Sequence, residues 1–153
     1  MTISVRVYGI LINDEHQVLV SDEYIRGNRF TKFPGGGLEI GEGTRDCLQR
    51  EFIEEMNLPV SVSDHIYTTD FFQVSAFNAA HQILSIYYFV KALEPVSVPL
   101  RNKEFDFTEE QLALYNDTLQ IESFRFVDWE NFSAEIVTLP IDKIVATILK
   151  EKY

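Results

Sequence analysis

The first apolar and polar positions of the chain follow the pattern of β-strands. Most positions of residues 5–12 are apolar, which predicts a strand buried on much of both faces. A polar turn follows, and residues 16–20 predict a second strand. Residues 21–31 are polar and lack a clear period, which predicts a loop. The run Phe33-Pro34-Gly35-Gly36-Gly37 predicts irregular backbone, because glycine allows conformations that are closed to other residues.

A helical period begins at residue 44, where Thr44 is the predicted N-cap. The apolar residues that recur every four positions, and so predict the face toward the core, are Leu48, Phe52 and Met56. Asn57 predicts the end of this helix, because Asn accepts the left-handed cap conformation better than most residues other than glycine.

The second half of the chain mixes β-rich and helical segments. Residues 68–77 and 82–93 are rich in β-branched and aromatic side chains and predict a long hairpin. A capping box at residues 108–111 predicts a short helix through about residue 115, and residues 122–129 predict another strand. Pro140 then begins a C-terminal helix with an apolar stripe. We therefore expect a single α/β domain spanning residues 1–153.

Composition narrows the classes of function. The 153 residues are 46% hydrophobic, which is typical of a globular protein. There are 24 acidic against 13 basic side chains, which disfavours a polymeric nucleic acid as partner, because phosphate backbones are bound by clustered Lys and Arg. No apolar run reaches the roughly 18 residues of a membrane helix, and the N-terminus does not read as a signal peptide. With Cys47 as the single cysteine, we expect a cytoplasmic protein without membrane association.

The most informative polar feature is a cluster of charges on the helix that begins near residue 44. Glu51, Glu54 and Glu55 share one face, since a helix turns about 100° per residue. Alone, they fit a solvated helix face, because like charges one turn apart cost only a few tenths of a kcal/mol. Arg50, Glu42 and the glycines upstream favour a metal site instead, because Mg²⁺ is typically held by a few carboxylates together with substrate phosphates.

The spacing of these residues resembles the signature of the Nudix hydrolases, the family of MutT-like enzymes. That signature is a Gly, a Glu six positions later, Arg-Glu after seven more residues, then Glu-Glu and a second Gly. The matching residues are Gly36, Glu42, Arg50, Glu51, Glu54 and Glu55. Six specified letters match by accident on the order of once in 10⁵ chains. The second glycine is Asn57 here, a mild departure because Asn also accepts the cap conformation.

The resemblance implies a Nudix-type α/β/α sandwich with a mixed β-sheet, and an enzyme that hydrolyses a diphosphate linkage in a nucleoside diphosphate derivative with Mg²⁺ or Mn²⁺. It implies that the metal is held by the carboxylates of Glu51, Glu54 and Glu55 and the carbonyl of Gly35. Arg50 would orient these glutamates, with Glu42 and Gly36 in supporting roles. The general base would be Glu51 or an acid outside the motif; the candidates are Glu104, Glu109, Glu110 and Glu122.

Residues that contact the substrate are expected around the glycine-rich turn. Tyr24, Phe30 and Phe33 are candidates for stacking on a base, and Arg26, Arg29 and Lys32 are candidates for contacting phosphate. The alternative is that these are ordinary packing and loop residues. The family's marks for ADP-ribose, dinucleotide polyphosphates and NADH are missing, which leaves a nucleoside triphosphate or a nucleotide sugar as the expected small-molecule substrate. The resemblance is also compatible with a homodimer.

Two other functions compete with this one. A non-catalytic Nudix domain that senses a nucleotide is the main alternative, although some such domains lose glutamates that are all present here. A scaffold that binds Ca²⁺ through its acidic face is the other, but the chain has no EF-hand spacing and the glycine-rich turn would be unexplained.

Overall fold

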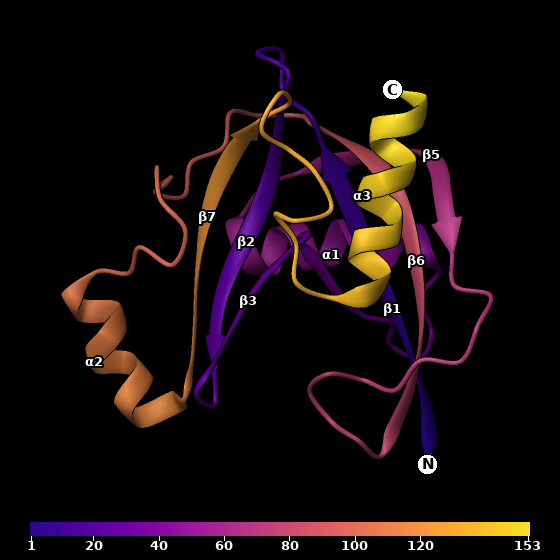
Figure 1. Ribbon diagram of the computed structural model, residues 1–153, viewed down its shortest axis with the longest axis horizontal. Helices are drawn as coiled ribbons and strands as arrows, with labels where there is room; N and C mark the ends of the chain where they lie inside the picture. Colours follow the sequence, from indigo (N-terminus) through magenta and orange to yellow (C-terminus); the bar gives the residue numbers. More distant parts are fainter. The chain divides into compact units, whose positions relative to one another are not determined.

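The computed structural model describes residues 1–153, and these form two compact units, each built from two separate segments of the chain (Figure 1). The first unit contains Met1–Ile12 and Pro34–Ser97, and the second contains Asn13–Phe33 and Val98–Tyr153. The expectation that residues 1–153 make a single domain stays a prediction. None of the three helices has the length and apolar character needed to span a bilayer.

The first unit is a mixed four-stranded sheet with a helix against it. The strand order is β4 (Gly35–Gly37), β1 (Thr2–Leu11), β6 (His81–Ala92) and β5 (Val60–Thr68). β1 runs parallel to β6, whereas β4 and β5 are antiparallel to their neighbours. Helix α1 (Thr44–Met56) contacts β4, β5 and β1. The predicted α/β class with a mixed sheet is thus confirmed.

Helix α1 packs on the sheet through the predicted apolar stripe. Leu48, Phe52 and Met56 are fully buried. The contact is close at Gly9, where an added Cβ would lie 2.8 Å from the ring of Phe52. The sheet therefore fixes the height and rotation of α1, and with them the direction of its polar face.

The ends of α1 differ in how well they were predicted. The N-cap is Gly43 and not Thr44, whose hydroxyl shares a 2.7 Å hydrogen bond with the hydroxyl of Tyr88. Asp46 completes this end by accepting a hydrogen bond from the Gly43 amide. At the other end, Asn57 takes the left-handed conformation with φ 49° and ψ 38°, as predicted.

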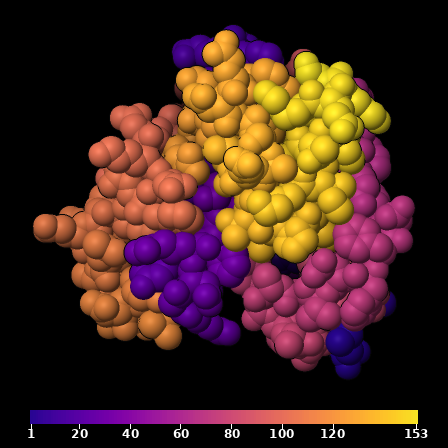
Figure 2. Space-filling view, viewed as in Figure 1, coloured from indigo at the N-terminus to yellow at the C-terminus, as the bar shows by residue number.

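The second unit is an antiparallel sheet with two helices. β2 (Gln17–Ile25) lies between β3 (Asn28–Lys32) and β7 (Gln120–Asp128). Helix α2 (Glu109–Thr118) opens with the predicted capping box, and α3 (Pro140–Lys152) begins at the predicted proline. Figure 2 shows the turn between β2 and β3 (purple) beside α2 (orange), where the Gly27 amide donates to the Tyr115 hydroxyl over 2.7 Å.

The prediction of a loop at residues 21–31 is wrong. β2 continues to Ile25, and β3 begins at Asn28 and pairs with it antiparallel. The buried positions within residues 21–31 are polar: Asp22, for example, is fully buried and accepts from Arg125 (2.8 Å) and from the Thr31 hydroxyl (2.7 Å). When buried polar side chains form hydrogen bonds with one another, a strand can form without alternating apolar residues.

The predicted hairpin of residues 68–77 and 82–93 is only half right. Residues 82–92 form β6, which pairs with the earlier strand β5, but residues 69–77 form no strand. They follow β6 only through an isolated bridge of Val74 to Gln82 and scattered backbone hydrogen bonds. Phe71 and Phe72 gave the segment its strand-like composition, but both are exposed. The glycine run is likewise more regular than predicted, because Gly35–Gly37 form a short strand on β1.

Candidate active site

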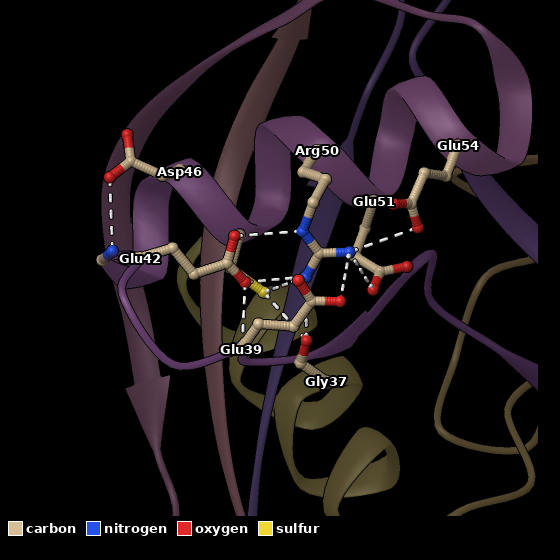
Figure 3. A network of polar contacts seen from close by, with 9 residues as sticks. Gly37, Glu39, Glu42, Asp46, Arg50, Glu51 and Glu54 are labelled. Carbon is tan, nitrogen blue, oxygen red and sulfur yellow. Dashed lines mark hydrogen bonds and ion pairs between the residues drawn. The ribbon is translucent and has the colours of Figure 1, made fainter.

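Arg50 lies at the centre of the charged residues of α1 (Figure 3). One edge of its guanidinium is bidentate on Glu42: Nε donates to Oε2 over 3.0 Å, and Nη2 donates to Oε1 over 2.7 Å. Nη2 also donates to the carbonyl of Gly37 over 3.0 Å. This edge therefore ties α1 both to the segment before it and to β4 by charge-assisted hydrogen bonds.

The remaining nitrogen of Arg50 contacts two of the predicted metal-binding glutamates. Nη1 donates to Glu51 Oε1 over 3.0 Å and to Glu54 Oε2 over 3.2 Å. Glu39 is a further anion near Nη1, at 3.7 Å. The side chain of Glu51 is 14% exposed, whereas that of Glu54 is 57% exposed. One arginine thus holds two carboxylates from successive turns of the helix.

The glycines of β4 have two distinct roles. A Cβ on Gly36 would collide with the carboxylate of Glu51, so any larger residue at this position would displace that carboxylate. The amide of Leu38 donates to Val5, and the carbonyl of Pro34 accepts from Gly9, both on the β1 side. By the alternation of an antiparallel ladder, the carbonyls of Gly35 and Gly37 point to the free edge of the sheet.

The electrostatics of the cluster follow from these contacts. Hydrogen bonding from Arg50, aided by the backbone at Glu39, lowers the pKa of Glu42 to about 2. The same carboxylates raise the pKa of Arg50 further above its ordinary value, Glu42 most of all. Burial raises the pKa of the Cys47 thiol to about 12. Glu42 and Arg50 are therefore charged at neutral pH, whereas Cys47 is a neutral packing residue and no nucleophile.

Arg45 and Tyr88 hold the start of α1. Arg45 donates from Nη1 to the carbonyls of Val62 and Ser63, each over 2.8 Å, and its guanidinium lies 4.7 Å from the centre of the Tyr88 ring. Together with the hydrogen bond between Thr44 and Tyr88, these contacts attach the first turn to β5 and β6. The polar face of α1 is thus presented by a rigid part of the unit.

The donor atoms of the cluster fit a hard divalent cation in kind. They are carboxylates on one helix face and the outward carbonyl of an edge strand, and such oxygen ligands are those that Mg²⁺ and Mn²⁺ prefer. No three Asp, Glu, His or Cys side chains converge here as they would around a metal. Figure 3 shows the carboxylates of Glu51 and Glu54 turned toward Arg50. The assignment of Glu51, Glu54, Glu55 and Gly35 as ligands stays a prediction.

The predicted substrate residues all lie in the second unit and are spread over it. Tyr24 and Arg29 share one face of the sheet, with Arg29 5.0 Å from the centre of the Tyr24 ring, and Tyr24 stacks on Tyr115. Phe30 and Lys32 point to the opposite face, since their positions alternate with Arg29 along β3. Arg26 lies in the turn between the strands, with φ 47°. Phe33 is fully buried beside the ring of Phe132, so its predicted stacking role is wrong. The other five residues do not form one group within their unit.

Sequence reasoning missed a second charged cluster, on the Lys32 face of β2, β3 and β7. Glu23 and Glu122 stand opposite each other in register, the Ser21 hydroxyl donates to Glu122 over 3.1 Å, and Lys32 lies 3.5 Å from Glu23. Burial, followed by the charge of Glu23, raises the pKa of Glu122 to about 7. The sequence holds no local signal of this cluster, because Glu23 and Glu122 meet only through the pairing of β2 with β7.

Of the four candidate bases outside the motif, Glu122 is thus the one in an unusual environment. Glu104, Glu109 and Glu110 are exposed. Glu122 is half-buried, and a carboxyl with a pKa near neutrality can both take up and release a proton at physiological pH.

Comparisons with known proteins agree with this architecture. The model of the NUDIX domain family matches residues 2–137. No curated protein matches the sequence. Among solved structures, the E. coli ORF135 protein aligns with a TM-score of 0.66 at 16% identity, over 99% of this chain and 91% of its own. A MutT protein from Methanosarcina mazei Go1 aligns with a TM-score of 0.66 at 15% identity, over 98% and 95%. An ADP-ribose pyrophosphatase from Streptococcus suis aligns with a TM-score of 0.53 at 12% identity, over 98% and 92%.

Proposed function

The chain belongs to the NUDIX domain family, and we propose that it is a metal-dependent pyrophosphohydrolase that cleaves a diphosphate linkage in a small nucleoside diphosphate derivative. The observation that carries the proposal is the polar face of α1. There, Glu51 and Glu54 are held side by side by Arg50, and Glu51 lies against a strand whose glycine leaves room for it.

The roles of the residues follow from their positions. Glu51, Glu54 and Glu55 would hold Mg²⁺ or Mn²⁺, with the outward carbonyl of Gly35 as a further ligand. Such a cation, when bound, neutralises phosphate charge and lowers the pKa of its water to a range where hydroxide forms readily. Arg50 fixes the rotamers of the glutamates, and the Gly37 carbonyl anchors Arg50.

The anchoring of Arg50 has a functional reason. A phosphate-bearing substrate carries several negative charges, and a mobile arginine would pair with it directly. Glu42 prevents this, because its carboxylate is ionised over the whole physiological range and occupies both donors of one guanidinium edge. Arg50 thereby remains a positioning residue. Glu51, whose side chain is far less exposed than that of Glu54, is the proposed general base.

A nucleoside triphosphate or a nucleotide sugar is the proposed substrate class. Similar structures include proteins described as a UDP-X diphosphatase and as an ADP-ribose pyrophosphatase, so a nucleoside diphosphate joined to another group fits the fold. The chain lacks the proline that marks ADP-ribose hydrolases, since residues 72–75 are Phe-Gln-Val-Ser. This departure favours substrates other than ADP-ribose.

Turnover of a nucleotide panel tests the proposal. The purified protein is incubated with nucleoside triphosphates, nucleotide sugars, ADP-ribose and dinucleotide polyphosphates, with Mg²⁺, with Mn²⁺ or with EDTA, and the phosphate-containing products are identified. We expect E54Q to lower kcat by orders of magnitude without loss of fold, because Glu54 is exposed and makes no packing contact that Gln cannot replace. E110Q, which changes an exposed glutamate of α2, is the matched control.

Two results would contradict the assignment. Wild-type turnover by E54Q would show that α1 does not carry the site. Tight nucleotide binding by the wild type without any product would instead support the alternative, a domain that senses nucleotides.

A further inference from the structure

The face of the first unit's sheet that is turned away from α1 carries a cation beside β4. Arg6 of β1 lies opposite Gly37 of β4 in register. Gly9 faces the ring of Phe52 on α1, and side chains alternate along a strand, so Arg6, three positions earlier, projects from the other face. Arg6 is half-buried, and its Nε donates to the hydroxyl of Tyr8 over 3.2 Å. This contact fixes one edge of the guanidinium.

The glycines of β4 bring this guanidinium close to the metal site proposed above. A Cβ added to Gly37 would lie 3.3 Å from Arg6 Nη1, so the guanidinium lies directly over this glycine. Gly35, whose carbonyl is a proposed metal ligand, is two residues away on β4, about 7 Å along the strand. Glu51 lies against Gly36, on the other face of the same strand. A diphosphate held at this edge through a cation would therefore have Arg6 within reach of its remaining oxygens.

The first unit has three other cationic side chains, Arg45, Arg50 and Lys91. Arg50 uses all three of its nitrogens on the carboxylates of α1 and its preceding loop and on the carbonyl of β4. Arg45 is bonded to carbonyls of β5, which lies at the opposite edge of the sheet from β4. Lys91 is six residues beyond the partner of Arg6 on β6, about 20 Å along that strand. Within this unit, Arg6 is thus the cation that is placed to contact a substrate at β4.

We propose that Arg6 binds the diphosphate of the substrate, by donating from its guanidinium to phosphate oxygens that do not ligate the cation. This inference rests on the proposed pyrophosphohydrolase function. One divalent cation does not neutralise Glu51, Glu54 and Glu55 together with a diphosphate, so the site needs a further positive charge. A guanidinium supplies that charge in a planar fork that matches two phosphate oxygens.

Steady-state kinetics with the nucleotide that turns over fastest in the panel test this role. R6Q should raise KM about 10- to 100-fold, as expected for the loss of a hydrogen bond to a charged group. The value of kcat should change less than about threefold, because the contact exists in the substrate complex as well as in the transition state. R6K should lie between R6Q and the wild type, since lysine keeps the charge but not the fork.

K91Q is the matched control, because it removes a positive charge from an exposed position of β6 in the same unit. It should leave KM within about twofold of the wild type, since exposed charges at a distance are screened by salt. An unchanged KM in R6Q, or an equal rise in K91Q, would overturn the inference and leave the proposed function standing. If the wild type turned over no nucleotide, the proposed function would fall and the inference with it.

A binding measurement detects the same contact without turnover. Methylenediphosphonate is a diphosphate analogue that resists hydrolysis and carries no base, so its affinity reports on phosphate contacts. In isothermal titration calorimetry with Mg²⁺ present, R6Q should bind it at least about tenfold more weakly than the wild type. Equal affinities would contradict a contact between Arg6 and phosphate.

Crystals of the wild type grown with methylenediphosphonate and Mg²⁺ do not depend on the folding of a variant. We expect a guanidinium nitrogen of Arg6 within about 3.2 Å of a phosphonate oxygen. A diphosphonate bound beside α1 with Arg6 more than about 4 Å from all of its oxygens would refute the inference.

Discussion

Replacement of Glu122 by Gln is expected to remove a large part of the pH dependence of stability. The pKa of Glu122 is about 7, against 4.5 for an ordinary glutamate, because of burial and the charge of Glu23. Between these two values the folded protein keeps a proton that the unfolded chain has released. The free energy of unfolding therefore falls as the pH rises from 4.5 and levels off above about 7.

The size of this effect follows from the distance between the two pKa values. Each pH unit is worth about 1.36 kcal/mol, so ionisation of Glu122 costs the folded state up to about 3 kcal/mol above pH 7. Gln has nearly the same shape, stays neutral and still accepts the hydrogen bond from Ser21. The stability of E122Q relative to the wild type should thus increase by about 2 to 3 kcal/mol between pH 5 and pH 8.

Urea unfolding at half-unit pH steps, followed by the fluorescence of Trp129, measures this difference within the second unit. E104Q is the control, because Glu104 is exposed and belongs to the same unit. E23Q should move the pH dependence of the wild type to lower pH, since it removes the charge that opposes ionisation of Glu122. A stability difference between E122Q and the wild type that stays constant from pH 5 to pH 8 would refute the reasoning.

Three further substitutions test other parts of the structure. G36A should weaken Mn²⁺ affinity by about 10- to 100-fold in calorimetry, because the added Cβ displaces the Glu51 carboxylate; an unchanged affinity would separate Glu51 from the metal site. D22A should lower the free energy of unfolding in urea by about 3 to 5 kcal/mol, because it leaves Arg125 buried without its carboxylate; a loss below about 1 kcal/mol would contradict this. N57G should raise the thermal stability by about 0.5 to 1 kcal/mol, because glycine accepts the left-handed cap without strain, and a lower melting temperature would count against that account.

Helix α1 shows how much of the site is visible in the sequence. Its apolar stripe, its end at Asn57 and the shared face of Glu51, Glu54 and Glu55 all follow from the helical period, which depends on residues within a few positions of one another. The carboxylate set and the family could therefore be predicted from the amino-acid sequence alone.

The errors in the predicted fold arise where the structure depends on residues far apart in the sequence. Residues 21–31 were predicted as a loop because the buried side chains of Asp22 and Thr31 are polar, and their partner Arg125 lies about a hundred positions away. Residues 68–77 were predicted as a strand because their composition is strand-like, but the regular partner of β6 is β5, which ends at Thr68. In both places, pairing with distant residues decided the structure, and local composition carries no record of such pairing.

The sequence by itself therefore determined the order of residues in the motif, the helix that displays them and the chemistry of their donor atoms. Only the tertiary structure decided that Arg50 binds Glu42 with one edge and Glu51 and Glu54 with the other, and that a half-buried Glu122 lies opposite Glu23. The physical reason is the distance along the chain over which each property is decided. Periodicity acts through neighbours along the chain, whereas the rotamer of a charged side chain and the pKa of a buried acid depend on groups that folding brings together from afar.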